Sequence, residues 1–163
     1  MKSLLFSLLA LGVFFSCDHE ILRSKSDKET ISIDQISTAV QQAFAATYPN
    51  TKVEWEAEDD GTFEAEFEMD GEEASANYSA TGQLLEIEVE IKKKAVPEAM
   101  LAALAVQFPD HKIEEAARIT YPDGRIAYEA ELEGKNDKKF DAIFSADGTV
   151  LKRIELGGEN DKD

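Results

Sequence analysis

The chain has 163 residues, of which 17 are Lys or Arg and 34 are Asp or Glu, so its formal net charge is −17. This balance excludes binding to nucleic-acid phosphates, which requires a basic footprint. The single Cys excludes an internal disulfide, and two distant His with one thiol exclude the usual zinc sites. A hydrophobic content of 43% is enough for a folded core in one domain or two small ones.

The N-terminus predicts export. Lys2 precedes an apolar run from Leu4 to Phe15. As a helix this run spans about 18 Å, which is too short for a hydrocarbon core of roughly 30 Å. We therefore expect residues 1–16 to be a signal peptide rather than a membrane span.

Ser16 and Cys17 end this run, and the pair resembles a bacterial lipoprotein signal. The resemblance implies that Cys17 is lipidated and becomes the first residue of the mature chain, although Phe14 departs from the usual leucine. An ordinary secretory signal with an incidental thiol is the alternative. Residues 17–32 are mostly polar and are predicted to be a tether, so the lipid would be the chain's one link to the membrane.

Two stretches about 60 residues apart repeat the same order of residue types, which indicates a duplicated unit. Each contains a helical block, an aromatic-Pro-Asn/Asp turn, a Glu-Ala-Glu block and a Ser-Ala-x-Gly block. In the first unit these blocks are Ile36–Phe44, Tyr48–Glu54, Phe63–Phe67 and Tyr78–Gly82, and in the second they are Val96–Leu104, Phe108–Glu114, Tyr128–Leu132 and Phe144–Gly148.

Each unit begins with a helical pattern, because its apolar residues recur at intervals of three and four. Asp34 is the predicted N-cap of the first helix, and Pro49 stops it. Pro97 suits the first turn of the second helix, which Pro109 ends. The apolar stripe of the first helix comprises Ile36, Ala39, Val40, Ala43, Phe44 and Tyr48.

After each helix the period changes to two, which predicts antiparallel strands with one buried and one solvent-facing side. A break in this alternation at Lys152 and Arg153 predicts a β-bulge in the last strand. The turns are expected at Asp60-Gly61, Asp70-Gly71, Thr81-Gly82, Asp123-Gly124, Gly134 to Asp137 and Asp147-Gly148. The aromatic residues with buried parity are Trp55, Phe63, Phe67, Tyr78, Tyr128, Phe140 and Phe144.

These patterns predict an α+β fold made of two tandem modules. Each module has one helix packed on a four-stranded antiparallel meander sheet. The modules are expected at residues 33–92 and 93–157, followed by a polar tail at 158–163.

The aromatic-Pro-Asn/Asp turn, the lysine-led strand after it and the closing Gly turn are similar to the PepSY-like module. The matching residues are Tyr48-Pro49-Asn50 with Lys52-Val53, Phe108-Pro109-Asp110 with Lys112-Ile113, and Gly82 and Gly148. Two such modules behind a lipoprotein signal resemble the β-lactamase-inhibitor-like, PepSY-like proteins of bacterial envelopes. The resemblance implies that each helix covers one sheet face and that the sheets of the two modules lie side by side. In inhibitor relatives it implies a concave sheet surface that grips an enzyme. It carries over no contact residue.

The negative charge is concentrated in the first module. Residues 31–92 contain 15 acidic and 2 basic residues, a net of −13, whereas residues 93–157 contain 12 and 10, a net of −2. The glutamates of neighbouring strands share the solvent-facing side, where like charges oppose each other unfavourably. The candidate partner-binding residues on this open face are Glu54, Glu56, Glu64, Glu66, Glu86 and Glu88.

Two explanations of this acidic face compete. It can attract a protein or peptide with a basic patch through electrostatic steering and complementarity. Alternatively, the glutamates keep an open sheet face soluble and prevent edge pairing, in a purely structural envelope protein.

A calcium site is a further alternative, because carboxylates are calcium ligands. The candidate segments are Glu58 to Gly61 and Asp70 to Glu73, neither of which has the alternating ligand order of an EF-hand. No motif for nucleophilic catalysis or phosphate binding is present. The sequence therefore predicts a non-enzymatic binding protein without a cofactor.

Overall fold

The computed structural model describes residues 30–135 and 138–155. The predicted signal peptide, Cys17 and the polar tail at 158–163 lie outside the described residues. Thr30 and Ile31, which the sequence assigned to the tether, form a short strand, β1. The α+β class is confirmed, with two α-helices and one antiparallel sheet in the described part of the chain.

The nine strands of the described residues form one sheet in which each strand pairs with the next along the chain. The four predicted strands of each module, β2 to β5 and β6 to β9, are present, and the two sets join into one continuous sheet because β5 and β6 pair from Ile87↔Thr120 to Glu90↔Ala117. β1 adds a further strand at the edge of β2. The strands are β1 Thr30–Ile31, β2 Val53–Ala57, β3 Phe63–Met69, β4 Glu72–Tyr78, β5 Leu84–Glu90, β6 Lys112–Thr120, β7 Ile126–Glu133, β8 Lys139–Ser145 and β9 Val150–Glu155.

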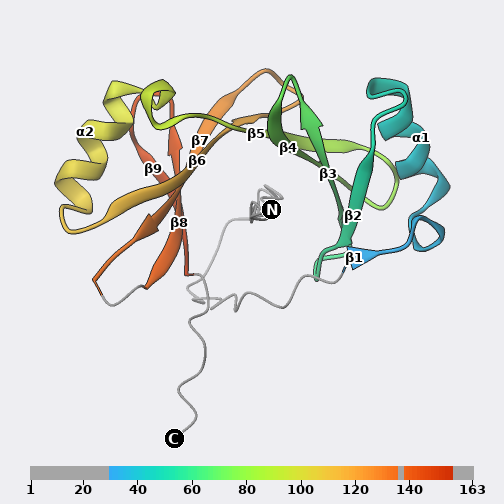
Figure 1. Ribbon diagram of the computed structural model, residues 1–163, viewed down its shortest axis with the longest axis horizontal. Helices are drawn as coiled ribbons and strands as arrows, with labels where there is room; N and C mark the ends of the chain where they lie inside the picture. The colour runs from blue at the N-terminus through green and yellow to red at the C-terminus, as the bar shows by residue number, and fades with distance from the viewer. Residues whose placement is uncertain (1–29, 136–137, 156–163) are drawn as a thin grey trace, which may run out of the picture.

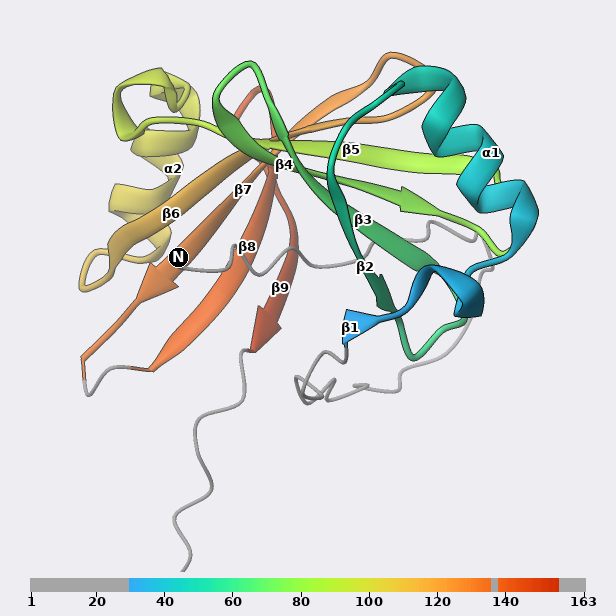
Figure 2. The ribbon, with the colours of Figure 1, turned by 45° about the vertical axis from the view of Figure 1, so that its right-hand side comes forward.

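The sheet bends into an arch, with both helices on its outer side (Figure 1). Helix α1 (Thr38–Thr47) lies against the end formed by β2 to β5, and α2 (Glu98–Gln107) against the end formed by β6 to β9 (Figure 2). The inner side of the arch is the sheet face opposite the helices. We call it the concave face.

Each helix packs its apolar stripe on the sheet. Val40 and Phe44 of α1 join a buried cluster with Trp55 and Phe67, and the Phe44 ring lies 5.4 Å from the Trp55 ring and 5.2 Å from that of Phe67. The second cluster joins Met100 and Leu104 of α2 to Leu132, Phe140 and Phe144. The predicted aromatic core is confirmed, because Trp55, Phe67, Tyr78, Phe140 and Phe144 are buried and Phe63 and Tyr128 pack against the clusters.

The predicted N-cap of the first helix is wrong. Asp34 lies inside a short 3-10 helix, Ile33–Gln35, which is held by a capping box between Ser32 and Gln35. Ser37 caps α1 instead, because its hydroxyl accepts a hydrogen bond from the Val40 amide at 3.3 Å. The helix ends at Thr47, before the Tyr48-Pro49 pair, as the proline predicts.

The turn and bulge positions follow the repeat. Gly61, Gly71, Gly82, Gly124 and Gly148 all have positive φ, as tight turns require. In β9 the pairing steps from Ile143↔Lys152 to Phe144↔Val150, which leaves Leu151 as the extra residue, one position before the predicted bulge. β5 has the equivalent bulge. Its pairing with β4 changes from Asn77↔Glu86 to Tyr78↔Leu84, so Leu85 is the extra residue.

Candidate functional site

The concave face carries two rows of side chains across its β2–β5 half. Register places Glu56, Glu64, Asn77 and Glu86 in one row, and Glu54, Glu66, Ser75 and Glu88 in the other. Side chains opposite each other on antiparallel strands have Cβ atoms about 4.5 to 5.5 Å apart. The structure therefore brings all six sequence-predicted glutamates together on one face, with Ser75 and Asn77 between them.

The tightest acidic group on this face joins β2 and β3. Oxygen atoms of Glu56, Glu64 and Glu66 all lie within 4.8 Å of one another. Carboxylates this close repel each other unless protons, cations or hydrogen-bond donors compensate the charge.

The acidic face is not the open plane that the sequence predicts. Glu56, Glu64, Glu86 and Glu88 are buried, Glu66 is half-buried, and only Glu54 of the six is exposed. A period of two assigns a side chain to a face but does not specify curvature, and the bend turns this face inward. Each of the five buried or half-buried carboxylates has an interaction partner.

Ser75 and Asn77 of β4 differ from these carboxylates. Asn77 is 1% exposed and Ser75 is fully buried. Within the described part of the chain, neither the Asn77 amide nor the Ser75 hydroxyl has a hydrogen-bond partner. A buried polar group without a partner carries a free-energy penalty, so both positions require an explanation.

The β6–β9 half of the concave face has an apolar centre. Ile119, Ala127 and Ile143 form a buried cluster, against which Tyr121 and Ile154 pack. The Arg125 guanidinium lies 4.8 Å from the centre of the Tyr121 ring. The concave face is therefore acidic in one module and largely apolar at the centre of the other.

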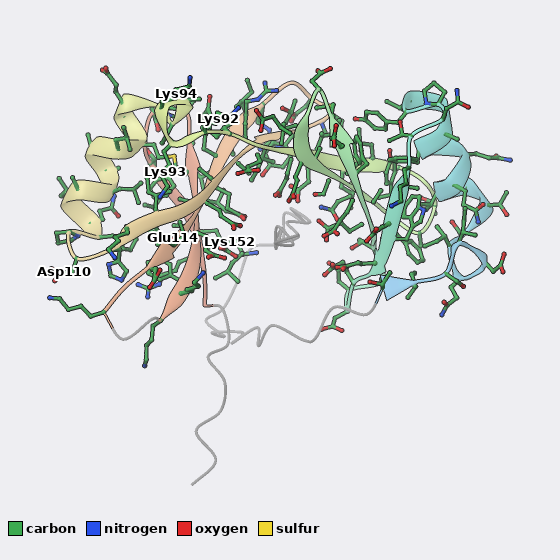
Figure 3. The ribbon with its side chains drawn as sticks, viewed as in Figure 1. Lys92, Lys93, Lys94, Asp110, Glu114 and Lys152 are labelled. Carbon is green, nitrogen blue, oxygen red and sulfur yellow. The ribbon has the colours of Figure 1, made fainter. Side chains whose placement is uncertain are left out.

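Charged groups surround this apolar centre. Lys152 of β9 points to the inner side of the arch (Figure 3). It pairs with Ile143 of β8, which in turn pairs with Glu129 of β7, so the three residues lie in one row across the sheet. Burial raises the pKa of Glu129 well above its ordinary value, and Asp141, Glu86 and Glu64 raise it further while Lys152 opposes the shift. Glu131 accepts a hydrogen bond from Lys139 at 2.6 Å.

The Tyr121 phenol interacts with charged groups of both modules, Glu86 and Glu88 of the first and Arg125 and Glu129 of the second. Burial, with the charges of Glu86 and Glu88, raises the pKa of its phenol to about 12. The phenol is therefore neutral at physiological pH and can donate a hydrogen bond.

The two predicted calcium segments lie at hairpin turns, and in each of them a carboxylate accepts hydrogen bonds from protein groups. The Asp60 carboxylate accepts from the Thr62 amide at 3.1 Å and from its hydroxyl at 2.6 Å. In the other segment, the Glu72 carboxylate accepts from Lys92 at 2.7 Å. Among the described residues, the carboxylate group compatible with a metal ion lies on the sheet instead.

Sequence reasoning missed the part of the concave face that lies in the second module. The repeat supplies the signal, because Glu129 and Glu131 stand where Glu64 and Glu66 stand in the first unit. In the same alignment of the two repeats, Ile143 corresponds to Asn77, Lys152 corresponds to Glu86 and Ile154 corresponds to Glu88. These exchanges of polar for apolar or basic residues account for the difference between the two halves.

Known proteins show the same architecture. A family model described as "Putative beta-lactamase-inhibitor-like, PepSY-like" matches residues 20–85 and 60–152. The chain belongs to this family. Two overlapping matches are consistent with the two-module arrangement of this PepSY-like protein.

Solved structures from Bacteroides species share the fold. A DUF2874 family protein from Bacteroides ovatus has a TM-score of 0.64 at 19% identity, with 75% of this chain and 89% of that chain covered. A BLIP-like protein from Bacteroides fragilis has a TM-score of 0.59 at 24% identity, with 78% of this chain and 92% of that chain covered. A protein from Bacteroides eggerthii, described as "putative periplasmic proteins", has a TM-score of 0.64 at 20% identity, with 74% of this chain and 88% of that chain covered.

No curated protein matches this chain at a significant level. Within residues 30–135 and 138–155, neither helix combines the length and apolar character that crossing a membrane requires.

Proposed function

We propose that this PepSY-like protein is an exported, non-enzymatic binding protein whose concave face recognises a basic segment of a protein or peptide. The observation that carries the proposal is the composition of that face. Acidic rows on β2 to β5 lie beside an apolar centre on β6 to β8, on the side of the sheet that carries neither helix.

Such a surface suits a segment with cationic side chains followed by apolar ones. Clustered carboxylates provide a negative potential that steers a cationic partner, and apolar contact on the half-buried Tyr121 and Ile154 adds affinity that salt does not screen. The mode of binding differs from the open plane that the sequence predicted, because a partner enters a curved face and competes with the interactions its carboxylates already have.

Export and an inhibitor-like role belong to the same proposal. The apolar N-terminal run before Cys17 supports export, and the eggerthii neighbour is described as periplasmic. The fragilis neighbour is described as BLIP-like, and a concave sheet that binds an enzyme is one form the proposed recognition can take. Lipidation of Cys17 would hold the protein at the membrane surface.

Affinity capture tests the proposal. The full chain is used to capture proteins from an envelope extract, and we expect a defined partner that is released as the salt concentration rises, because 1 M salt reduces the Debye length to about 3 Å. The triple variant Glu64→Gln, Glu66→Gln, Glu88→Gln should lose that partner.

The control variant is Asp34→Asn, Asp59→Asn, Glu98→Gln. It removes the same formal charge from exposed positions away from the concave face. Capture that survives the first triple change, or that falls equally in both variants, contradicts recognition by this face.

A further inference from the structure

We propose that the first module holds a calcium ion on the concave face, bound by Glu56, Glu64 and Glu66 with Asn77 and Ser75 beside them. This site differs from the two turn segments that the sequence suggested. It requires no protein partner and stands independently of the proposed function.

The first argument is the spacing of the carboxylates. Calcium takes six to eight oxygen ligands at about 2.3 to 2.6 Å, so oxygens on opposite sides of the ion are about 4.6 to 5.2 Å apart. The oxygen atoms of Glu56, Glu64 and Glu66 lie within 4.8 Å of one another. One ion can therefore contact all three carboxylates without a change in the backbone.

The second argument is independent of the acidic residues. Asn77 is opposite Glu64 and Ser75 is opposite Glu66, on the same face of the neighbouring strand. They are 1% and 0% exposed, and their side-chain polar atoms have no hydrogen-bond partner among the described residues. An amide oxygen and a hydroxyl are calcium ligands, so an ion at this position would satisfy two groups that otherwise carry a burial penalty.

The kind of ligand decides the kind of ion. The cluster offers carboxylate, amide and hydroxyl oxygens, which are hard donors. Zinc prefers nitrogen and sulfur ligands, and magnesium keeps several waters and rarely uses a cage made only of protein groups. A buried cluster rich in protein oxygens therefore favours calcium.

The second module supplies an internal comparison. Glu129 and Glu131 stand where Glu64 and Glu66 stand, but Ala117 pairs with Glu129 where Glu56 pairs with Glu64. Ile143 replaces Asn77 in the same alignment. The second module thus lacks the Glu56 carboxylate and the Asn77 amide, although Asp141 stands where Ser75 stands. Among the described residues, three carboxylates that come within 4.8 Å of one another are found in the first module alone, so we infer one site per chain.

Isothermal titration calorimetry with calcium chloride and the full chain tests this inference. We expect one calcium ion per chain, with a dissociation constant on the order of 10⁻⁴ M as in extracellular modules, and weaker binding of magnesium. The double variant Glu64→Gln, Glu66→Gln should weaken calcium binding at least tenfold. The matched control Glu129→Gln, Glu131→Gln changes equivalent residues and the same formal charge, and it should leave the affinity within twofold.

Asn77→Leu separates a ligand from a structural residue. It removes the amide but keeps the volume, so we expect at least a fivefold loss of calcium affinity with a calcium-free melting temperature that is equal to or above that of the wild type. Three results would overturn the inference. The wild-type chain would show no heat of calcium binding up to 10 mM calcium, the two double variants would lose calcium affinity equally, or Asn77→Leu would bind calcium with wild-type affinity. None of these results depends on whether a protein partner exists.

Discussion

Glu129 shows how one buried carboxyl on the concave face affects stability. Burial is the largest cause of its raised pKa, followed by the charges of Asp141, Glu86 and Glu64, whereas Lys152 lowers it. In the unfolded chain a glutamate has a pKa of about 4.3. The folded state therefore binds more protons than the unfolded state between these two pKa values, and stability falls as the pH rises through that interval.

Glu129→Gln is accordingly expected to raise the free energy of unfolding at pH 7. Each unit by which the folded-state pKa exceeds the unfolded one is worth about 1.4 kcal/mol, and the neutral amide avoids this penalty. The gain should disappear below about pH 4, where Glu129 is protonated in both states. Urea unfolding at a series of pH values measures it.

Glu131→Gln is the control on the same strand. Glu131 is paired with Lys139 at 2.6 Å, so removing its charge should lower stability at pH 7. A loss of stability in both variants would show that Glu129 is stabilised as an anion, contrary to the direction of its pKa shift.

Glycines at hairpin turns determine how closely each helix approaches the sheet. Gly82 and Gly148 both have positive φ, and a Cβ built at these positions would lie 2.7 Å from the Ala39 carbonyl oxygen and 2.5 Å from the Ala99 carbonyl oxygen. Each contact joins the first turn of a helix to the last hairpin of the same module. The equivalence of the two sites explains why the repeat keeps glycine at both.

Gly82→Ala should destabilise the protein by about 2 to 5 kcal/mol. About 1 to 2 kcal/mol comes from a left-handed conformation with a Cβ, and the contact with Ala39 adds the cost of overpacking, about 1 to 3 kcal/mol. Gly61→Ala provides the control, because Gly61 has φ 83° but a Cβ placed there would meet no atom of the described residues within 4 Å. Chemical denaturation measures both variants, and equal losses would exclude a role for helix contact.

Local sequence patterns predicted much of each element but not how the elements join. The alternation of Glu64, Ala65 and Glu66 correctly divided the two faces of β3, and the helix-ending prolines were located correctly. Sequence did not reveal that β5 and β6 pair, because an edge strand carries no local signal of which other edge it meets. The alternation also did not predict that Glu64 and Glu86 are buried, because a period of two assigns a side chain to a face but not its exposure.

In the described part of the chain, each helix covers its own buried cluster on one continuous sheet. One cluster surrounds Phe44 and the other surrounds Met100. The modules are joined by the ladder from Ile87↔Thr120 to Glu90↔Ala117. A domain of about 60 residues buries only about 60% of the surface that its unfolded chain exposes, less than a larger domain does, and is marginally stable alone. We therefore expect the two modules to unfold together.

Trp55 makes this expectation testable, because it is the one tryptophan of the chain and lies in the core of the first module. Met100→Ala, in the second core, should destabilise the protein by about 2 to 5 kcal/mol. If unfolding is cooperative, the Trp55 fluorescence transition and the circular dichroism transition should move together by the same amount. Val106→Ala is the control on the same helix, since Val106 is 80% exposed, and it should shift neither transition by more than about 0.5 kcal/mol. A Trp55 transition that stays at its wild-type position in Met100→Ala would show that the first module unfolds independently, and that the β5–β6 ladder does not couple the two cores.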